Sequence, residues 1–318
     1  MRAVTVTEHD GEKRLALAEH EAPEPGAEDV VVAVRAISLN NGEVRGSLAA
    51  SAGYRPGWDF AGVVESAPAN SEFTAGDRVV GLKFEGAWAE RVSVPRNFAA
   101  KIPDSIGFDV AATLPVAGLT ATLALGKKMV GPGSKVLVTA ATGGVGLFAI
   151  QLAAATGAHV TAFLRHDDDA PLMRRLGASS VAIGIEEAAR LAPYDLVLEG
   201  VGGALLGHAL SWLAPRGVCV QFGDAGGDEL TTFDAKAFRL GPGGAFGGTS
   251  LYGFFLGEEL ARPQPAVAGP ILADLAARLA DGTLSPVIGE TGSWRDIDRI
   301  ARSLLARRFK GKAVLHID

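Results

Sequence analysis

The residue types most suggestive of chemistry lie in the segment 140–146, Ala-Ala-Thr-Gly-Gly-Val-Gly. Glycine lets the backbone turn sharply and lets a bound group approach the main chain closely. Where such a turn opens a helix, unpaired N–H groups and the positive end of the helix dipole bind a pyrophosphate without any charged side chain. The spacing is a close variant of the dinucleotide fingerprint and therefore predicts a bound dinucleotide.

The segments around this turn have the pattern that a dinucleotide site requires. Residues 135–139 are an apolar, β-branched run typical of a buried parallel strand, and residues 147–155 have a helical pattern. A second strand, residues 159–164, follows Gly157. The chain contains 41 glycines, so an isolated match would carry little weight. The strand–turn–helix–strand context favours nucleotide binding over an ordinary glycine turn.

The composition limits the partners and the compartment. A length of 318 residues predicts two domains, and a net charge of -6 offers no general attraction to nucleic acid. Cys219 is the only cysteine, which excludes an internal disulfide and any multi-cysteine zinc site. We find neither an apolar signal core nor a long uncharged span, so we expect a cytoplasmic protein without a membrane segment.

Two patterns of secondary structure follow one another along the chain. Up to about residue 101, short strands alternate with Pro, Gly and Asn signals, which predicts an antiparallel β barrel or sandwich. From about residue 135, strands alternate with helices, which predicts a doubly wound parallel sheet. The expected strands are 3–6, 29–37, 61–65, 78–81, 87–94, 135–139, 159–164, 180–183, 195–199, 218–222 and 312–317; the expected helices are 108–114 and 118–126, separated by Pro115, then 147–155, 170–176, 270–280 and 294–305, with a Pro-containing connection after residue 256.

The end of the second strand of the nucleotide unit indicates which dinucleotide binds. NAD-preferring proteins of this type carry an acidic residue there to bind the ribose 2′-OH. Leu164 occupies that position and Arg165 follows it, so a 2′-phosphate would meet a guanidinium. We therefore predict NADPH. In the alternative interpretation Arg165 is a solvated strand end, and the acidic run 167–169 would repel a phosphate if it turned inward.

Several further motifs occur along the chain in a fixed order. They are Ser38-Leu39-Asn40, residues 56–64, Gly76-Asp77-Arg78-Val79, residues 114–121, the fingerprint, residues 198–203 and Lys310-Gly311-Lys312. In these motifs and their order, the chain resembles the medium-chain dehydrogenase/reductase superfamily, in its zinc-free quinone oxidoreductase (zeta-crystallin-like) branch. The resemblance implies an α/β protein in which a GroES-like β-barrel catalytic domain, residues 1–115 and 257–318, carries an inserted Rossmann domain, residues 116–256. The nicotinamide then lies between the domains.

The same resemblance predicts that zinc is absent. Zinc-dependent relatives place a Cys near Asn40, a His at the position of Trp58 and a Cys or Asp near Val116. Neither Trp nor Val can donate a lone pair to a metal. Without a Lewis acid, direct alcohol dehydrogenation is disfavoured, and hydride delivery to an electrophilic acceptor is easier.

The family pattern also implies the cofactor contacts. Asn40 and Thr120 would lie by the nicotinamide, and Lys312 near the junction of the domains. Asn40 could instead form an Asx turn, Thr120 could be an ordinary helix residue, and Lys312 could be a solvated charge. The full predicted set is Asn40, Thr120, Thr142, Gly143, Gly144, Val145, Gly146, Arg165, His166, Val201, Phe222, Gly223, Phe254 and Lys312.

The implied reaction is hydride transfer from NADPH to a quinone or an α,β-unsaturated carbonyl. Asn40, Tyr54 and Thr120 are the candidate catalytic residues. Tyr54 can donate a hydrogen bond to the developing oxyanion and pass on a proton, although it could also be a buried aromatic, and Arg45 is a second candidate. We expect Asp59 and Glu43 to be structural hydrogen-bonding residues, paired with Arg55 or Arg45.

Two further expectations concern partners and alternatives. The apolar segment 249–256 resembles the strand that ends the Rossmann sheet, and an open edge there predicts a homodimer, whereas a covering helix 270–280 would make it internal.

A second possible function is a pathway-specific enoyl reductase or cyclisation enzyme acting on a bulky or carrier-bound intermediate. A third, of another class, is a non-catalytic nucleotide-binding protein with a structural or regulatory role.

Overall fold

The computed structural model describes residues 1–240, 247–261 and 268–318. The Pro-containing connection expected after residue 256 lies largely outside them. The chain divides into two compact units, one formed by Met1–Leu119 with Leu260–Asp318 and the other by Thr120–Glu259. We call them unit 1 and unit 2 and describe each by itself.

Unit 1 is built on a seven-stranded sheet in the order β14-β15-β3-β4-β5-β7, with β6 paired to β3. The pairs are antiparallel except β14 with β15, as expected for a GroES-like domain with a C-terminal return. A separate hairpin, β1–β2, accompanies the sheet. The strands are β1 Arg2–His9, β2 Glu12–Glu19, β3 Asp29–Leu39, β4 Asp59–Ser66, β5 Arg78–Leu82, β6 Arg91–Pro95, β7 Ala99–Lys101, β14 Ile288–Ser293 and β15 Lys312–His316.

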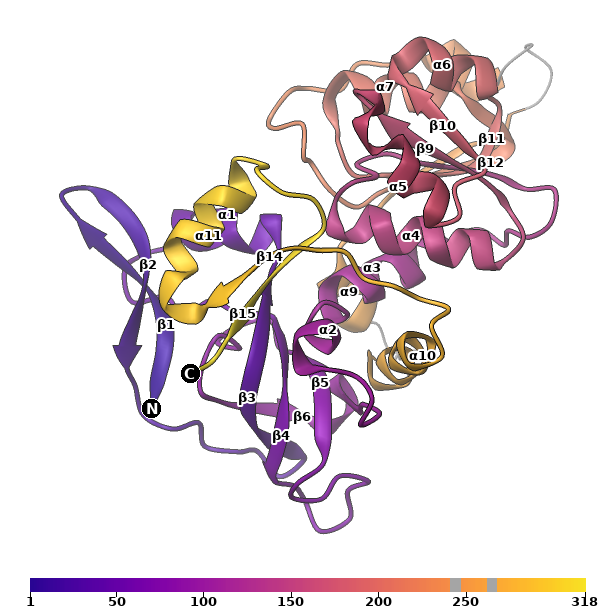
Figure 1. Cartoon of the computed structure of the whole chain (residues 1–318). Helices are drawn as coiled ribbons and strands as arrows, with labels where there is room; N and C mark the ends of the chain where they lie inside the picture. Colours follow the sequence, from indigo (N-terminus) through magenta and orange to yellow (C-terminus); the bar gives the residue numbers. More distant parts are fainter. Residues whose placement is uncertain (241–246, 262–267) are drawn as a thin grey trace. The chain divides into compact units, whose positions relative to one another are not determined.

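The helices of unit 1 place its polar residues. α1 begins directly after β3, and in Figure 1 it lies beside α11. Our prediction that Pro115 separates two helices was wrong in detail, because Pro115 is the first residue of α3, where its missing N–H costs nothing. The helices are α1 Asn41–Ala49, α2 Phe108–Ala112, α3 Pro115–Leu125, which continues into unit 2, α10 Ala268–Ala280 and α11 Ile297–Leu305.

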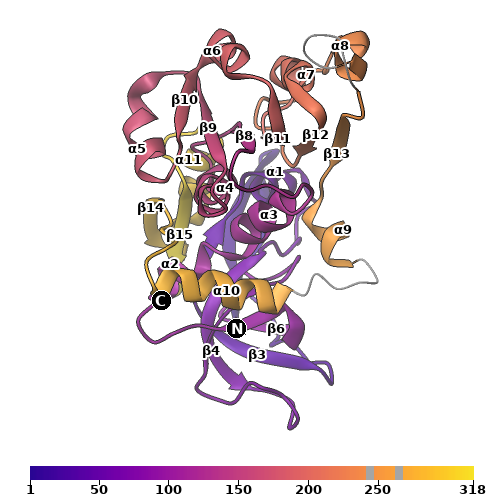
Figure 2. The same ribbon diagram turned by 90° about the vertical axis from the view of Figure 1, so that its right-hand side faces the viewer.

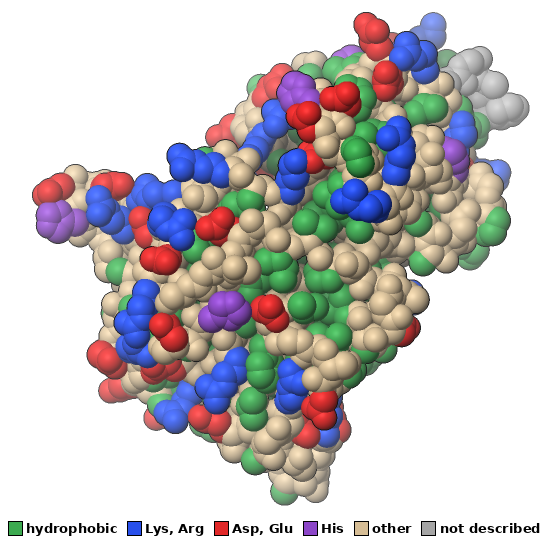
Figure 3. Space-filling view, in the orientation of Figure 1, with side chains coloured by type: hydrophobic (Ala, Val, Ile, Leu, Met, Phe, Trp, Pro, Cys, Tyr) green, Lys and Arg blue, Asp and Glu red, His purple; other side chains and the backbone are tan. Residues whose placement is uncertain are grey.

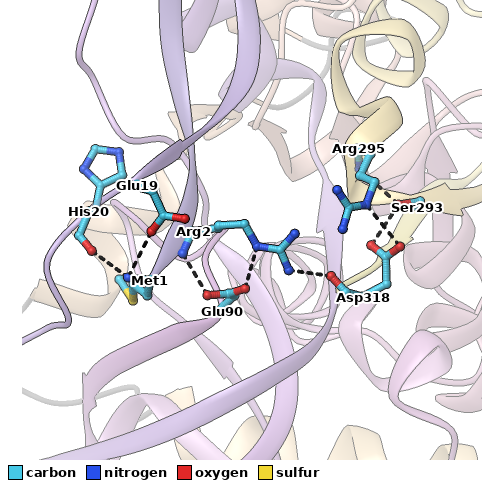
Figure 4. A network of polar contacts seen from close by, with 8 residues as sticks. All are labelled: Met1, Arg2, Glu19, His20, Glu90, Ser293, Arg295 and Asp318. Carbon is cyan, nitrogen blue, oxygen red and sulfur yellow. Dashed lines mark hydrogen bonds and ion pairs between the residues drawn. The ribbon is translucent and has the colours of Figure 1, made fainter.

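Ion pairs and hydrogen bonds tie the first strand of unit 1 to the C-terminal residue of the chain (Figure 4). Arg2 donates from Nε to Glu90 Oε1 at 2.8 Å and from Nη2 to the backbone oxygen of Asp318 at 2.7 Å. The Asp318 carboxylate in turn meets Arg295 and Ser293. Since these pairs are half-exposed, each contributes little alone, but together they hold β1 beside the C-terminal segment.

Unit 2 is a doubly wound sheet of six parallel strands in the order β10-β9-β8-β11-β12-β13. The chain runs outward from β8 to β10 and then returns to β11 on the other side of β8. In such sheets ligands bind beyond the carboxyl ends of the strands at this switch point. The strands are β8 Lys135–Val138, β9 His159–Leu164, β10 Ser180–Ile183, β11 Tyr194–Glu199, β12 Leu213–Gln221 and β13 Ser250–Gly253.

Helices connect these strands, as the alternating pattern predicted. α4 packs on β8 and β9, and α6 packs on β9 and β10. Figure 2 shows β13 at the edge of the sheet. The segment is therefore an edge strand within the chain and not an internal one. The helices are α4 Gly144–Ala155, α5 Ala170–Arg175, α6 Gly184–Leu191, α7 Gly203–Ser211, α8 Ala235–Leu240 and α9 Leu256–Ala261.

On the face shown in Figure 3, acidic and basic side chains are interspersed in both units. Among the described residues, no helix has the length and apolar character needed to cross a membrane.

Candidate functional site: a glycine turn and a buried polar cluster

The glycine turn after β8 is tight enough to require glycine at one position. The N–H of Gly143 donates to the backbone oxygen of Ala140 at 2.9 Å, and Ala140 has a positive φ of 46°. A Cβ added to Gly146 would lie 2.4 Å from that same oxygen, which no real side chain tolerates. The first turn of α4 therefore sits directly against the end of β8, with Thr142 to Val145 partly exposed. Its free N–H groups can bind an anion there.

A buried carboxylate braces the neighbouring loop. Glu199, at the end of β11, accepts hydrogen bonds from the N–H groups of Val201 at 2.8 Å and Gly202 at 3.1 Å. Thr139, at the end of β8, donates its hydroxyl to Glu199 at 3.1 Å and accepts from the N–H of Gly200 at 2.9 Å. Burial raises the pKa of Glu199, while these donors pull it down. We did not anticipate this role, for which the only sequence signal is an acidic residue at the end of a strand.

The predicted cofactor residues of unit 2 gather at the carboxyl edge of the sheet. The N–H of Phe222 donates to the Glu199 backbone oxygen at 2.8 Å, which brings the end of β12 to the end of β11. The Phe222 ring lies so close to Gly200 that an added Cβ there would approach it to 2.7 Å. Phe254 follows β13, is buried, and donates its N–H to the Gln221 backbone oxygen. Gly223 lies against the β11 loop, since a Cβ added there would approach the Gly200 backbone oxygen to 3.2 Å, and Val201 follows Gly200 in that loop.

A pocket of about 570 Å³ lies beyond β9 and β10 and is lined by Arg165. Arg165 is exposed and makes no hydrogen bond or ion pair to the described part of the chain. Leu164 before it is buried, so no carboxylate stands where NAD-binding proteins carry one. The other lining residues are Phe163, Ile183, Gly184, Ile185, Glu186, Glu187 and Arg190.

The acidic residues that line this pocket are not those of the acidic run 167–169. In the alternative interpretation that run would repel a phosphate if it turned inward, but Asp167–Asp169 form a short 3-10 helix and do not line the pocket, and His166 precedes them. The lining acids are Glu186 and Glu187, which sequence reasoning missed. Glu187 is occupied, since it accepts from the N–H of Ile183 at 2.8 Å and faces Arg190 at 3.6 Å. The Glu187 carboxylate is therefore engaged by Ile183 and Arg190, and no ion pair joins it to Arg165 among the described residues.

Unit 1 holds a buried cluster around Asp59, the first residue of β4. Asp59 Oδ2 accepts from Ser38 at 2.7 Å, from Asn40 Nδ2 at 2.9 Å and from Lys312 Nζ at 3.0 Å. Its Oδ1 accepts from the N–H of Val116 at 2.9 Å. Asp59 is 0% exposed and Lys312 is 3% exposed, so this ion pair is fully desolvated. Strand pairing explains the meeting, because β3 lies between β4 and β15.

Glu43 completes the cluster from the first turn of α1. Its Oε2 accepts from the backbone N–H of Asn40 at 3.2 Å and from Asn40 Nδ2 at 3.1 Å. The oxygen Oδ1 of Asn40 accepts from Lys312 Nζ. Burial, and after it the charge of Asp59, raises the pKa of Glu43 well above its usual range, against the opposing effects of Lys312 and Asn40. Four polar side chains from β4, β15 and the start of α1 thus share one buried site.

This arrangement bears on three interpretations that the sequence left open. Lys312 is not a solvated charge, because its ammonium is buried against Asp59. Asp59 accepts from Lys312, and Glu43 accepts from Asn40. The pairing was missed because Lys312 is 253 positions from Asp59 in the sequence. Asn40 is the N-cap residue of α1, so its turn role and its place in the cluster coexist.

Tyr54 and Thr120, the other two candidate catalytic residues, have no side-chain hydrogen bond to this cluster among the described residues. Tyr54 is half-buried, and its hydroxyl makes no hydrogen bond to the described residues. Burial and nearby Glu85 raise its pKa, which keeps the phenol protonated. Thr120 is buried in α3. Within the described ranges, no group of three or more His, Cys, Asp and Glu side chains could hold a metal ion. A Lys–Asp pair instead occupies the region around Asn40, where the resemblance places the zinc site of relatives.

Comparisons with known proteins agree with both units. Residues 26–104 match the alcohol dehydrogenase GroES-like domain and residues 144–268 match the zinc-binding dehydrogenase family. A mycocerosic acid synthase-like polyketide synthase of Mycobacterium tuberculosis is 31% identical over 92% of this chain, which spans only 14% of that relative. A mycobacterial structure solved with NADPH has 26% identity and a TM-score of 0.85, with 99% of each chain covered. A Pseudomonas syringae quinone oxidoreductase has 28% identity and a TM-score of 0.85, covering 99% of this chain and 100% of that one.

The two domain matches, the sheet topology and the glycine turn identify the class of protein. The chain belongs to the medium-chain dehydrogenase/reductase superfamily. Within it, the structural neighbours and the absence of the zinc-ligand residue types from positions 40, 58 and 116 place the chain in the quinone oxidoreductase branch. It is an oxidoreductase fold with a GroES-like and a Rossmann unit.

Proposed function

We propose that this protein is a zinc-independent oxidoreductase that uses NADPH to reduce a quinone or an α,β-unsaturated carbonyl. The observation that carries the cofactor assignment is Arg165, whose guanidinium has no partner among the described residues and lines a pocket beside the buried Leu164. A guanidinium suits a 2′-phosphate, and the missing carboxylate removes the usual partner of a ribose 2′-OH. The mycobacterial neighbour that was solved with NADPH supports the same cofactor.

The residues of unit 2 fit a dinucleotide at the carboxyl edge of the sheet. The pyrophosphate would lie on the first turn of α4, where Gly146 leaves no room for a side chain. Val201 and Gly223 would line the ribose, in loops that Glu199 holds in place. NADPH supplies the hydride, and the protein's part is to bind and orient the cofactor.

Tyr54 is the best candidate for assisting the acceptor. Reduction of an enone places negative charge on its oxygen, which a hydrogen-bond donor stabilises. The Tyr54 phenol has a raised pKa and a hydroxyl that no described residue engages, so it is available as a donor. Asn40 and Thr120 stay predicted neighbours of the nicotinamide, and Lys312 a predicted residue of the cofactor region.

The test of the function is NADPH oxidation against a panel of quinones and enones, with NADH in parallel. Arg165→Ala should raise the apparent KM for NADPH by about tenfold to a hundredfold, because a charge-assisted hydrogen bond to the 2′-phosphate is lost. The use of NADH should stay nearly unchanged. The matched control is Arg175→Ala, which removes an exposed arginine of the neighbouring helix α5. An equal effect of Arg165→Ala on both cofactors would refute the assignment.

One comparison favours a second function. The 31% identity to a polyketide synthase supports a dedicated enoyl reductase acting on a carrier-bound intermediate. Turnover with an enoyl thioester but not with quinones would select this alternative. Tight NADPH binding without turnover of any acceptor would instead select the third possibility, a non-catalytic nucleotide-binding protein.

We also propose a homodimer formed through β13. This strand is the edge of the sheet, and Leu251 and Phe255 are exposed at 46% and 61%. An exposed apolar edge can pair with its own copy and continue the sheet. Size-exclusion chromatography with light scattering checks this, and a monomer at micromolar concentration would contradict it. The cytoplasmic location stays a prediction from composition.

A further inference from the structure

The pocket beside Arg165 is lined by a second arginine. Arg190 of α6 also lines it, and 69% of the Arg190 side chain is exposed. The sheet explains the meeting, because Ile183 lies opposite Leu164 in the parallel pair of β9 and β10, so α6 begins beside the end of β9. All the residues that line the pocket belong to unit 2.

The course of α6 directs Arg190 toward the pocket. Gly184 has a φ of 76°, which glycine adopts without strain, and the helix begins at this residue directly after β10. Arg190 lies about 9 Å further along the helix axis. Because side chains on a helix lean toward its N-terminus, the long side chain of Arg190 extends back toward the pocket.

The partner of Arg190 in the described part of the chain is a weak one. Its Nη2 lies 3.6 Å from Glu187 Oε1, which is too long for a hydrogen bond. The other oxygen, Glu187 Oε2, accepts from the N–H of Ile183, the N-cap residue of α6, at 2.8 Å. An exposed ion pair of this kind contributes little stability. The N–H groups of the Arg190 guanidinium are therefore available to a stronger acceptor.

A phosphate in this pocket requires more than one cation. A phosphate monoester carries a charge of about −1.5 to −2 near neutral pH, whereas one guanidinium carries a single positive charge. Glu186 and Glu187 add negative charge to the lining, and this charge repels a phosphate. Arg165 alone therefore leaves an excess of negative charge, which Arg190 in the same lining offsets.

We propose that Arg190 is a second specificity-determining residue, which donates hydrogen bonds to the same 2′-phosphate as Arg165. Because the ligand is NADPH only under the proposed function, this role rests on that function. Glu187 keeps its hydrogen bond from Ile183 in the complex, and the phosphate, with its larger negative charge, becomes the main acceptor of the guanidinium. Two guanidinium groups on one phosphate favour NADPH over NADH, which has only a hydroxyl at that position.

Fluorescence titration with NADPH and with NADH measures this role without requiring turnover. Arg190→Ala should raise the Kd for NADPH about three- to tenfold, because a charge-assisted but exposed contact is lost. The Kd for NADH should stay nearly unchanged. The matched control is Arg175→Ala in α5, which removes an exposed arginine outside the pocket lining. An unchanged Kd for NADPH, or an equal rise for NADH, would overturn the proposal.

A second variant distinguishes a direct contact with the phosphate from neutralisation of Glu187. Arg190→Ala also leaves the Glu187 carboxylate without its cation, and that charge by itself weakens the binding of an anion. Glu187→Gln removes the charge, while its amide oxygen can still accept from the N–H of Ile183. The loss caused by Arg190→Ala should persist in the Glu187→Gln background. If it disappears there, Arg190 acts only on Glu187 and the proposal is wrong.

Two shorter nucleotides separate this role from the proposed function. Adenosine 2′,5′-bisphosphate and adenosine 5′-phosphate differ only in the 2′-phosphate and contain no nicotinamide, so their calorimetric titration is independent of hydride transfer. A preference for the bisphosphate that Arg165→Ala and Arg190→Ala each reduce would support the two-arginine site even if the protein oxidised no NADPH. A preference that only Arg165→Ala reduces would overturn the role of Arg190 and leave the cofactor assignment standing.

Discussion

The buried cluster of unit 1 and the glycine turn of unit 2 are two polar sites built by opposite means. The cluster places charged and amide side chains in the interior, where Asp59 is 0% exposed. The turn has no charged side chain at all and relies on backbone N–H groups that Gly143 to Gly146 leave accessible. One site therefore depends on the balance of charges, and the other on the absence of side-chain atoms.

This difference determines how each site fails. In the cluster, the loss of one partner leaves another charge buried and unpaired, which is worse than losing the pair together. In the turn, the damaging change is the addition of atoms, because the end of β8 and the start of α4 are already in contact. Substitutions can therefore distinguish a site that fails by loss of charge balance from one that fails by added side-chain atoms.

The largest effect should follow Lys312→Met. The change leaves the Asp59 carboxylate buried without its counterion, and we expect a loss of about 3–5 kcal/mol in the free energy of unfolding. Chemical denaturation followed by the fluorescence of Trp88 and Trp294, both fully buried in unit 1, measures it.

The paired control is the double variant Asp59→Asn with Lys312→Met, which removes both charges. Most of the lost stability should return, since a neutral amide can still meet Ser38 and Asn40. If the double variant is as unstable as Lys312→Met alone, charge balance is not what stabilises the cluster.

A smaller loss of stability should follow Gly146→Ala in the turn. The new methyl group would lie 2.4 Å from the Ala140 oxygen and 2.9 Å from the Ala141 Cα, both backbone atoms that yield only if the turn shifts. Overpacking of this kind costs about 1–3 kcal/mol, and the displaced N–H groups should weaken NADPH binding. Thermal unfolding and fluorescence titration with NADPH report the two effects. Unchanged binding would show that the close contact is unnecessary.

The smallest effect, of opposite sign, should follow Gly46→Ala in α1. An added Cβ there meets nothing within 4 Å, and Gly46 lies inside a helix. Alanine should therefore stabilise the protein by about 0.5–1 kcal/mol through helix propensity. Chemical denaturation of both variants, Gly46→Ala and Gly146→Ala, measures the two changes in the free energy of unfolding. If both variants were destabilised, the space around each glycine would not explain the difference between them.

Much of the fold could be predicted from the sequence because the patterns that indicate it lie in neighbouring residues. The alternation of strands and helices after residue 135 and the turn at 140–146 predicted the parallel sheet, which the structure confirms. Strand β2 was missed because Glu12, Lys13 and Arg14 give it a charged start, and only its pairing with β1 shows it to be a strand. Strand β14, rich in glycine and polar residues, was missed for a similar reason.

The residues of the candidate sites could be predicted from the sequence to different degrees. Arg165 stood out because it follows a strand whose end has a known role in dinucleotide binding. Glu199 was not recognised, since its partners are backbone N–H groups that no side-chain pattern reveals. Glu186, Glu187 and Arg190 line the pocket only because α6 follows β10, next to β9 in the sheet.

The sequence alone determined the nucleotide turn, the zinc-free pattern at positions 40, 58 and 116, and the two-domain organisation. Each of these follows from the types of single residues or from patterns of neighbouring residues. Only the tertiary structure decided that Lys312 is the partner of Asp59 and that Glu43 shares Asn40 with them. The reason is that pairing of β3 with both β4 and β15 joins residues far apart in the chain. Burial then changes their charge states, a property that no single residue carries by itself.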